Sequence, residues 1–143
     1  MFGAFNILLK KRDVVFSEVN GQLLDRGQPI SGARIRQRWS HDGNNDQSRE
    51  TMTDAEGRFR FERIDEPRKF RGPFNAFRVA QLLDAFIDGE RVKLWSGGKF
   101  YPEENSEYRG QQFDVVCDIA HPFKKQSGPD SIVSRCINLH LEE

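Results

Sequence analysis

Apolar and polar residues alternate along most of the first two thirds of this 143-residue chain. Turn residues interrupt the alternation about every eight to twelve positions, which is the spacing of a domain built from short strands. The clearest run covers residues 58–64, where Phe59 and Phe61 are separated by arginines. A period of two predicts half-buried strands. The pattern therefore predicts an all-β fold, an antiparallel β-sandwich of about seven strands.

The other expected strands and turns follow from the same pattern. We expect strands over these ranges: 15–23, 33–39, 51–53, 83–87, 90–95, 112–119 and 132–141. In the first of them, Phe16 belongs to the polar, outward face. Residues 41–48, 67–72 and 96–110 are polar or rich in Pro and Gly, and they are predicted to be surface connections. Asp54–Gly57 reads as a tight turn.

The segment 74–87 allows two interpretations. Phe74, Phe77, Leu83 and Phe86 fit helical spacing, with Gly89 ending the helix. Alternatively, the Asp-Gly pair at 88–89 is the turn of a hairpin. We favour a short helical turn near 74–78 followed by the hairpin, because Asp-Gly between alternating residues is a strong hairpin signal.

Composition places the chain among single-domain proteins. We expect an N-terminal segment over 1–13 and one β-sandwich domain over 14–143, since the length fits one domain. The formal net charge is zero and the pI is about 6.8, so a dedicated nucleic-acid binder is disfavoured. The charges at 10–12 follow the apolar N-terminal run, unlike in a secretory signal, so we expect a cytoplasmic protein. In a reducing compartment Cys117 and Cys136 would be buried thiols.

Two segments of the first half carry a family resemblance. Residues 18–35 combine a strand, the Gly27-x-Pro29 turn and the Gly32-Ala33 corner, and residues 51–61 read Thr-x-Thr-Asp-x-x-Gly-x-Phe-x-Phe. This pattern resembles the carboxypeptidase-regulatory-like, or transthyretin-like (prealbumin-like), domains over residues 16–64. The resemblance implies a transthyretin-like sandwich, and it implies an accessory or binding role because such modules rarely carry chemistry. Pieces of the second half, at 92–96, 104–108 and 116–119, are similar to an uncharacterised bacterial group of stand-alone proteins with this domain.

Three patterns point weakly to chemistry. Cys117 and Cys136 are each followed four residues later by a histidine, His121 and His140, a set that could bind zinc. Residues four apart on a strand are about 13 Å apart, so the spacing argues against one metal site. Tyr108-Arg109-Gly110 resembles the C-terminal motif of the transthyretin-like hydroxyisourate hydrolases, but here the motif is internal and a polar turn is expected.

Iron dioxygenases with a related sandwich hold their metal with two tyrosines and two histidines. The chain contains Tyr101, Tyr108, His121 and His140, but it lacks the closely spaced His-x-His pair of those enzymes. We therefore expect no catalytic residues, no cofactor and no metal site.

The most informative polar pattern is an arginine ladder. Two predicted strands place arginines on their outward faces, and the candidate partner-binding residues are Arg34, Arg36, Arg38, Trp39, Arg58 and Arg60. If the strands adjoin, five guanidinium groups share one outer surface. Arginine is favoured at protein interfaces and pairs with carboxylates. Charge reversal at Arg36 and Arg60 is then expected to shift the melting temperature by no more than about 2 °C while abolishing partner binding.

These observations predict a non-catalytic protein-binding sandwich. The expected partner is a protein with an acidic surface; by analogy, the chain would be a bacterial immunity protein that binds a cognate toxin of the type VI secretion effector type. Nucleic acid is disfavoured, because the acids at 42 and 46 would repel phosphate, and a membrane partner is not expected. The alternatives are an accessory carbohydrate- or peptide-binding module, and a metal-dependent or hydroxyisourate-hydrolase-like enzyme.

Overall fold

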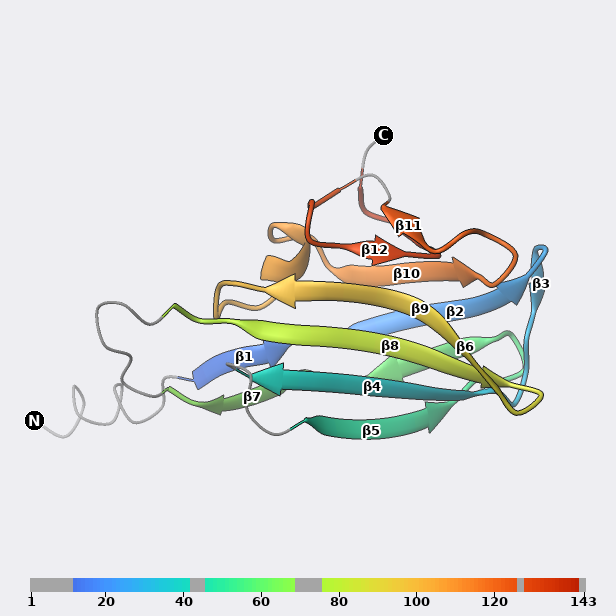
Figure 1. Cartoon of the computed structure of the whole chain (residues 1–143), viewed down its shortest axis with the longest axis horizontal. Coiled ribbons are helices and arrows are strands. Elements are labelled where there is room, and N and C mark those ends of the chain that lie inside the picture. Colours follow the sequence, from blue (N-terminus) through green and yellow to red (C-terminus); the bar gives the residue numbers. More distant parts are fainter. Residues whose placement is uncertain (1–11, 42–45, 69–75, 126–127, 142–143) are drawn as a thin grey trace, which may run out of the picture.

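The computed structural model describes residues 12–41, 46–68, 76–125 and 128–141. Nearly all of its regular structure is β (Figure 1). The strands are β1 (Arg12–Phe16), β2 (Val19–Asp25), β3 (Gln28–Pro29), β4 (Arg34–His41), β5 (Gln47–Met52), β6 (Arg58–Phe61), β7 (Ile64–Pro67), β8 (Val79–Ile87), β9 (Glu90–Lys99), β10 (Phe113–Asp118), β11 (Lys124–Lys125), β12 (Val133–Ser134) and β13 (Cys136–Asn138). A single 3₁₀ turn, η1 (Ser106–Tyr108), is the one helical element in the described residues. Those residues contain no helix of the length and hydropathy that a bilayer crossing requires.

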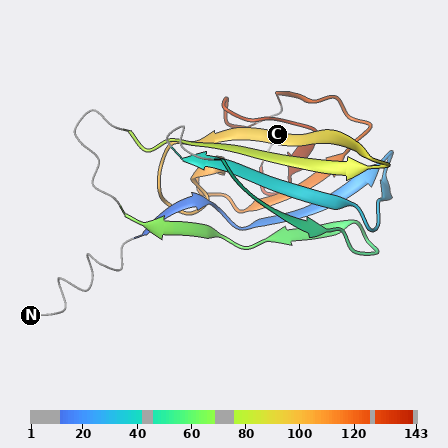
Figure 2. The ribbon, with the colours of Figure 1, turned by 60° about the horizontal axis from the view of Figure 1, so that its bottom comes forward.

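The strands form two main sheets that pack face to face, which confirms the all-β sandwich. One sheet has six strands in the order β11-β12-β9-β8-β4-β5, and the other has five, with β13-β10-β2-β3 in line and β6 beside β2. Strands β1 and β7 form a separate pair. Figure 2 shows β4, β8 and β9 as one layer above β2 and β6. Pairing is antiparallel except between β2 and β10, which run parallel.

Three predicted strands are divided in two in the structure, and this accounts for half of the difference between the thirteen strands observed in the described residues and the seven expected. The predicted strand 15–23 breaks at Ser17 and Glu18 into β1 and β2. The predicted strand 58–64 breaks into β6 and β7. The two breaks lie opposite each other, because β2 pairs with β6 and β1 pairs with β7. The predicted strand 132–141 breaks at Arg135, where the chain passes from the six-stranded to the five-stranded sheet. Phe16, expected on an outward face, is fully buried.

The hairpin interpretation of the middle segment is confirmed. β8 and β9 are antiparallel partners joined by Asp88 and Gly89, whose φ angles of 53° and 80° suit a tight turn. Residues 69–75 lie outside the described part of the chain. Residues 76–78 contain no helix and lead directly into β8. The predicted short helix near 74–78 is therefore wrong for the residues that can be described.

An irregularity in the β8–β9 pairing moves two large residues into the core together. Leu83 pairs with Trp95 and Asp84 pairs with Lys93, so the register shifts between these two pairs. Leu94 therefore has no partner on β8 and forms a β-bulge. Leu94 and Trp95 are consequently both fully buried. The Trp95 ring packs on Phe113 with their centroids 4.7 Å apart. The prediction that 96–110 is a surface connection is wrong, since β9 continues through the buried Lys99.

The two cysteines are joined, which corrects the expectation of free thiols. Cys117 on β10 and Cys136 on β13 are direct cross-strand partners with Cα atoms 4.0 Å apart, and they form a disulfide. Both are buried. The prediction of free thiols was wrong because it assumed a reducing compartment and because the sequence pattern does not show that β10 and β13 are paired strands.

Candidate functional site

The structure separates the predicted arginines into two groups. Arg34, Arg36, Arg38 and Trp39 lie on β4 in the six-stranded sheet, whereas Arg58 and Arg60 lie on β6 in the five-stranded sheet. The intervening apolar residues of both strands pack in one core between the sheets. The two sets of guanidinium groups therefore project from opposite sides of the sandwich. The expected surface of five adjoining arginines does not exist.

The outer face of the six-stranded sheet is nevertheless rich in cations. Cross-strand partners share a face, and three successive rows run Arg34–Phe86–Arg91, Arg36–Asp84–Lys93 and Arg38–Leu82–Ser96. On the β5 side, these rows end at Met52, Glu50 and Ser48. The rows contain five cations and two carboxylates. We call this surface, defined by Arg34, Arg36, Arg38, Arg91 and Lys93, the arginine face.

Two of its arginines are engaged within the protein. Arg34 pairs with Glu50 at 3.1 Å and lies over the Phe86 ring, 4.1 Å from its centroid. Arg36 lies 4.9 Å from the same centroid and donates a 3.3 Å hydrogen bond to Asp84, whose side chain is fully buried. Arg36 is thus the counterion of a buried carboxylate, and its role includes the stability of the sheet.

Arg38 differs from both. No hydrogen bond or ion pair among the described residues involves its guanidinium group. It borders a trough of about 230 Å³ that is also lined by one carboxylate, Asp46, and by Ala80, Leu82, Ser96 and Gly97. Trp39, one of the predicted partner-binding residues, is half-buried and packs against the core. The guanidinium group of Arg38 is therefore available to a ligand, whereas Trp39 contributes to packing.

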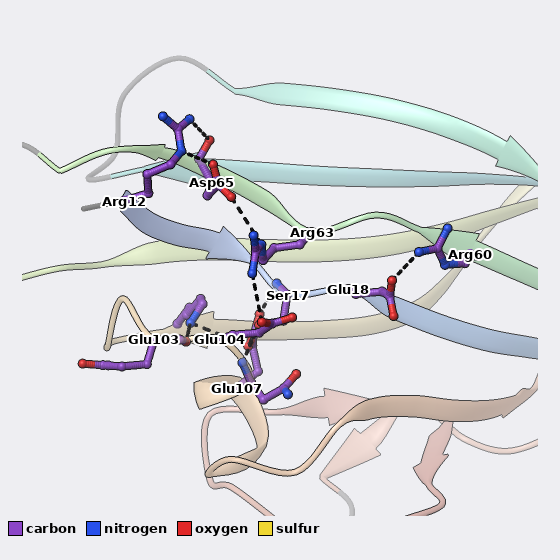
Figure 3. A network of polar contacts seen from close by, with 11 residues as sticks. Arg12, Ser17, Glu18, Arg60, Arg63, Asp65, Glu103, Glu104 and Glu107 are labelled. Carbon is purple, nitrogen blue, oxygen red and sulfur yellow. Dashed lines mark hydrogen bonds and ion pairs between the residues drawn. The ribbon is translucent and has the colours of Figure 1, made fainter. Parts of the chain in front are cut away.

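The opposite face carries the other two predicted arginines. Arg60 forms an ion pair with Glu18, drawn in Figure 3, and this contact lowers the pKa of that carboxyl group. The guanidinium group of Arg58 makes no hydrogen bond or ion pair with other described residues. Both line a wide concavity of about 560 Å³ over β2, β6 and β10, which also reaches the exposed Leu139. This face is open and mixed in character, with Asp114 offsetting its positive charge.

A buried ion pair that the sequence analysis missed lies at one end of the sandwich. The Nζ of Lys99 is 3.8 Å from the Oε1 of Glu107, and both side chains are inaccessible to solvent. Glu107 accepts hydrogen bonds from the backbone N–H and the hydroxyl of Ser17, at 2.9 and 2.6 Å, and from Gln81 at 3.0 Å. Burial lowers the pKa of Lys99, and the neighbouring carboxylates partly offset that effect. Two isolated charges eight residues apart give no periodic signal, so the alternation of apolar and polar residues could not reveal this pair.

A surface network surrounds this buried pair. Asp65 on β7 contacts Arg12 and Arg63, and Arg63 also donates a 3.0 Å hydrogen bond to Glu104 (Figure 3). This network therefore connects β1 and β7 to the turn before η1. These residues are exposed or half-buried, and such pairs add only a few tenths of a kcal/mol to about 1 kcal/mol each.

The residues considered for zinc and iron are placed apart or are already engaged. The two cysteines share a disulfide, and His140 contacts Asp114 at 2.5 Å. Tyr108 lies in the core, where its hydroxyl accepts a 2.8 Å hydrogen bond from the Trp95 indole, and burial raises its pKa. Tyr101 is exposed. In the Tyr108–Gly110 motif, Arg109 and Gly110 have φ angles of 54° and 95°, so this motif forms a turn before β10.

The fold and these surfaces define an all-β sandwich domain with a cation-rich outer face on one sheet. Residues 19–122 match the family described as a domain of unknown function, DUF6795. Because the match covers most of the chain, the protein belongs to that family. No curated protein and no solved structure matches it.

Proposed function

We propose that this protein is a non-catalytic binding domain that docks an acidic protein partner on the arginine face. The observation that carries the proposal is the excess of cations over carboxylates in the three rows around Phe86. Arginine side chains supported by aromatic rings are common at the centres of protein interfaces. The cysteines, Tyr108, Lys99 and Glu107 are held in structural contacts within the sandwich, which favours binding over catalysis.

Matched double variants test this assignment. Arg34→Glu/Arg38→Glu reverses one paired and one unpaired arginine on the arginine face, and Arg58→Glu/Arg60→Glu does the same on the opposite face. We expect the wild type and the second variant to bind poly-L-glutamate at low salt and the first variant to lose at least tenfold in affinity. Equal losses in both variants would contradict the proposal. Tighter binding of duplex DNA than of poly-L-glutamate would instead favour a nucleic-acid partner.

The immunity role is the specific form of this proposal. It is supported by analogy with small inhibitor domains and by the cation-rich face, and a type VI secretion effector is the partner class that we propose. The test is whether co-expression of this chain protects cells from the product of the adjacent gene. If the Arg34→Glu/Arg38→Glu variant still protects the cells, immunity does not depend on the arginine face.

Two further proposals concern the evolutionary relationship of the domain and its location in the cell. We propose a relationship to the carboxypeptidase-regulatory-like domains, supported by the Asp54–Gly57 corner, where the Asp54 carboxylate accepts backbone hydrogen bonds from Glu56 and Arg58 at 2.9 and 2.8 Å. We also propose a cytoplasmic location. The disulfide makes this testable, since cytoplasmic thiols are normally kept reduced. Cells are quenched in acid and the protein is then alkylated under denaturing, non-reducing conditions, which should label both cysteines if the protein is cytoplasmic and neither if it is exported.

A further inference from the structure

Two exposed aromatic residues follow the end of β9, and one of them, Phe100, extends the arginine face. Phe100 and Tyr101 are 49% and 67% exposed. The Phe100 ring lies over Gly98, because a Cβ placed on that glycine would be only 2.8 Å from the ring. Lys99 points into the sandwich, so Gly98 and Phe100 point outward. The ring is therefore on the same side of the sheet as Arg38.

The register fixes the position of Phe100 relative to Arg38. Gly98 pairs with Ala80, and the Arg38–Leu82–Ser96 row is the next row along. Ala80 and Gly97 are among the residues that line the trough beside Arg38. Small residues thus lie between the exposed ring of Phe100 and Arg38, whose guanidinium group has no partner among the described residues. β9 lies two strands from β4, about 10 Å across the sheet, and Phe100 lies four residues beyond Ser96, about 13 Å along β9. The diagonal distance from Arg38 to Phe100 therefore matches the length of about five residues of extended chain.

The turn that carries the aromatic residues is held from inside. The buried Nζ of Lys99 donates hydrogen bonds to the carbonyl oxygens of Tyr101, at 2.8 Å, and Glu103, and to the hydroxyl of Ser106. The backbone N–H of Val14 donates to the carbonyl of Pro102 at 2.8 Å. Exposed aromatic side chains on a fixed turn bind with little loss of conformational entropy.

We propose that Arg38, the trough and Phe100 form one docking surface for an extended acidic segment of a partner protein. This inference rests on the proposed function and specifies the partner's chemistry. A carboxylate of the segment pairs with Arg38. An apolar or aromatic side chain about five residues away packs on Phe100, and a small apolar residue between them enters the trough.

A selection from a displayed library of random twelve-residue peptides tests the proposal. The wild type is the bait, and the Arg38→Glu variant is used for counter-selection. We expect enriched peptides to contain Asp or Glu about five residues from Leu, Phe or Trp. In titrations with a synthetic copy of the best peptide, Arg38→Glu and Phe100→Ser should each weaken binding at least tenfold. Arg58→Glu, on the opposite face, should change it less than twofold.

The outcomes separate this inference from the proposed function. If acidic peptides depend on Arg38 but bind Phe100→Ser normally, the arginine face stands and the composite surface is wrong. If selection yields no enrichment over the counter-selected pool, or yields peptides without acids, both are wrong. Circular dichroism melts of each variant show whether a loss of binding reflects a loss of fold. Phe100→Leu, which keeps an apolar side chain, should recover part of the affinity.

Discussion

Arg36 offers the sharpest test of how the arginine face is built. The sequence alone predicts that reversing its charge leaves stability almost unchanged, whereas the structure makes it the counterion of the fully buried Asp84. Arg36→Glu would leave two carboxylates facing each other in a site with little water. Breaking a buried pair costs about 3–5 kcal/mol. Because a quarter of the Arg36 side chain is exposed, we expect Arg36→Glu to lower the free energy of unfolding by a smaller amount, about 2–3 kcal/mol.

That loss is measurable against a control from the same strand. At 2–4 °C per kcal/mol for a domain of this size, Arg36→Glu should lower the melting temperature by about 5–10 °C. Arg38→Glu, without a described partner, should stay within about 2 °C. Urea denaturation of a double-mutant cycle with Asp84→Asn should give a coupling of at least about 1 kcal/mol. Equal melting temperatures for the Arg36 and Arg38 variants would refute the pairing.

Three other perturbations address the scaffold. Cys136→Ser removes a link between residues 19 positions apart, and the free energy of unfolding in urea should fall by about 3 kcal/mol, as it should for the reduced wild type. The Asp118 carboxylate loses solvation on burial, but three backbone N–H groups donate to it and lower its pKa. Its contribution should therefore be present at neutral pH and fall as the pH drops below about 4, and Asp118→Asn should flatten that acid-side slope in pH-dependent melts. Gly57→Ala should lower the free energy of unfolding by at least about 2 kcal/mol, because Gly57 has a positive φ and a Cβ there would lie 2.4 Å from the Leu23 carbonyl oxygen. Gly27 also has a positive φ, but the space around it is open, so Gly27→Ala should lower the free energy of unfolding by only about 1 kcal/mol.

The strand pattern was predictable because it depends on local alternation. Phe59 and Phe61 are buried between exposed arginines as period two requires, and Asp88-Gly89 forms the expected turn. Alternation does not report where a strand leaves one sheet for another. The breaks at Ser17 and Arg135 depend on long-range contacts: Ser17 binds Glu107, and Arg135 donates to the carbonyl of Lys93.

The candidate site was only partly predictable for the same reason. Alternation correctly places Arg34, Arg36 and Arg38 on one face of β4. Which strand lies beside β4 is a question of topology, and the chain pairs it with β8 instead of β6. The cations that complete the face, Arg91 and Lys93, therefore escaped notice. They come from the second strand of the hairpin, two strands away.

Amide chemical-shift mapping tests the central claim most directly. A ¹⁵N-labelled sample is titrated with the selected acidic peptide, and the shifted amides are located on the two sheets. The account predicts that they cluster on β4, β8 and the end of β9, around Arg38, Leu82 and Phe100. Shifts concentrated on β2, β6 and β10, around Gln22, would place the binding surface on the other sheet and contradict it.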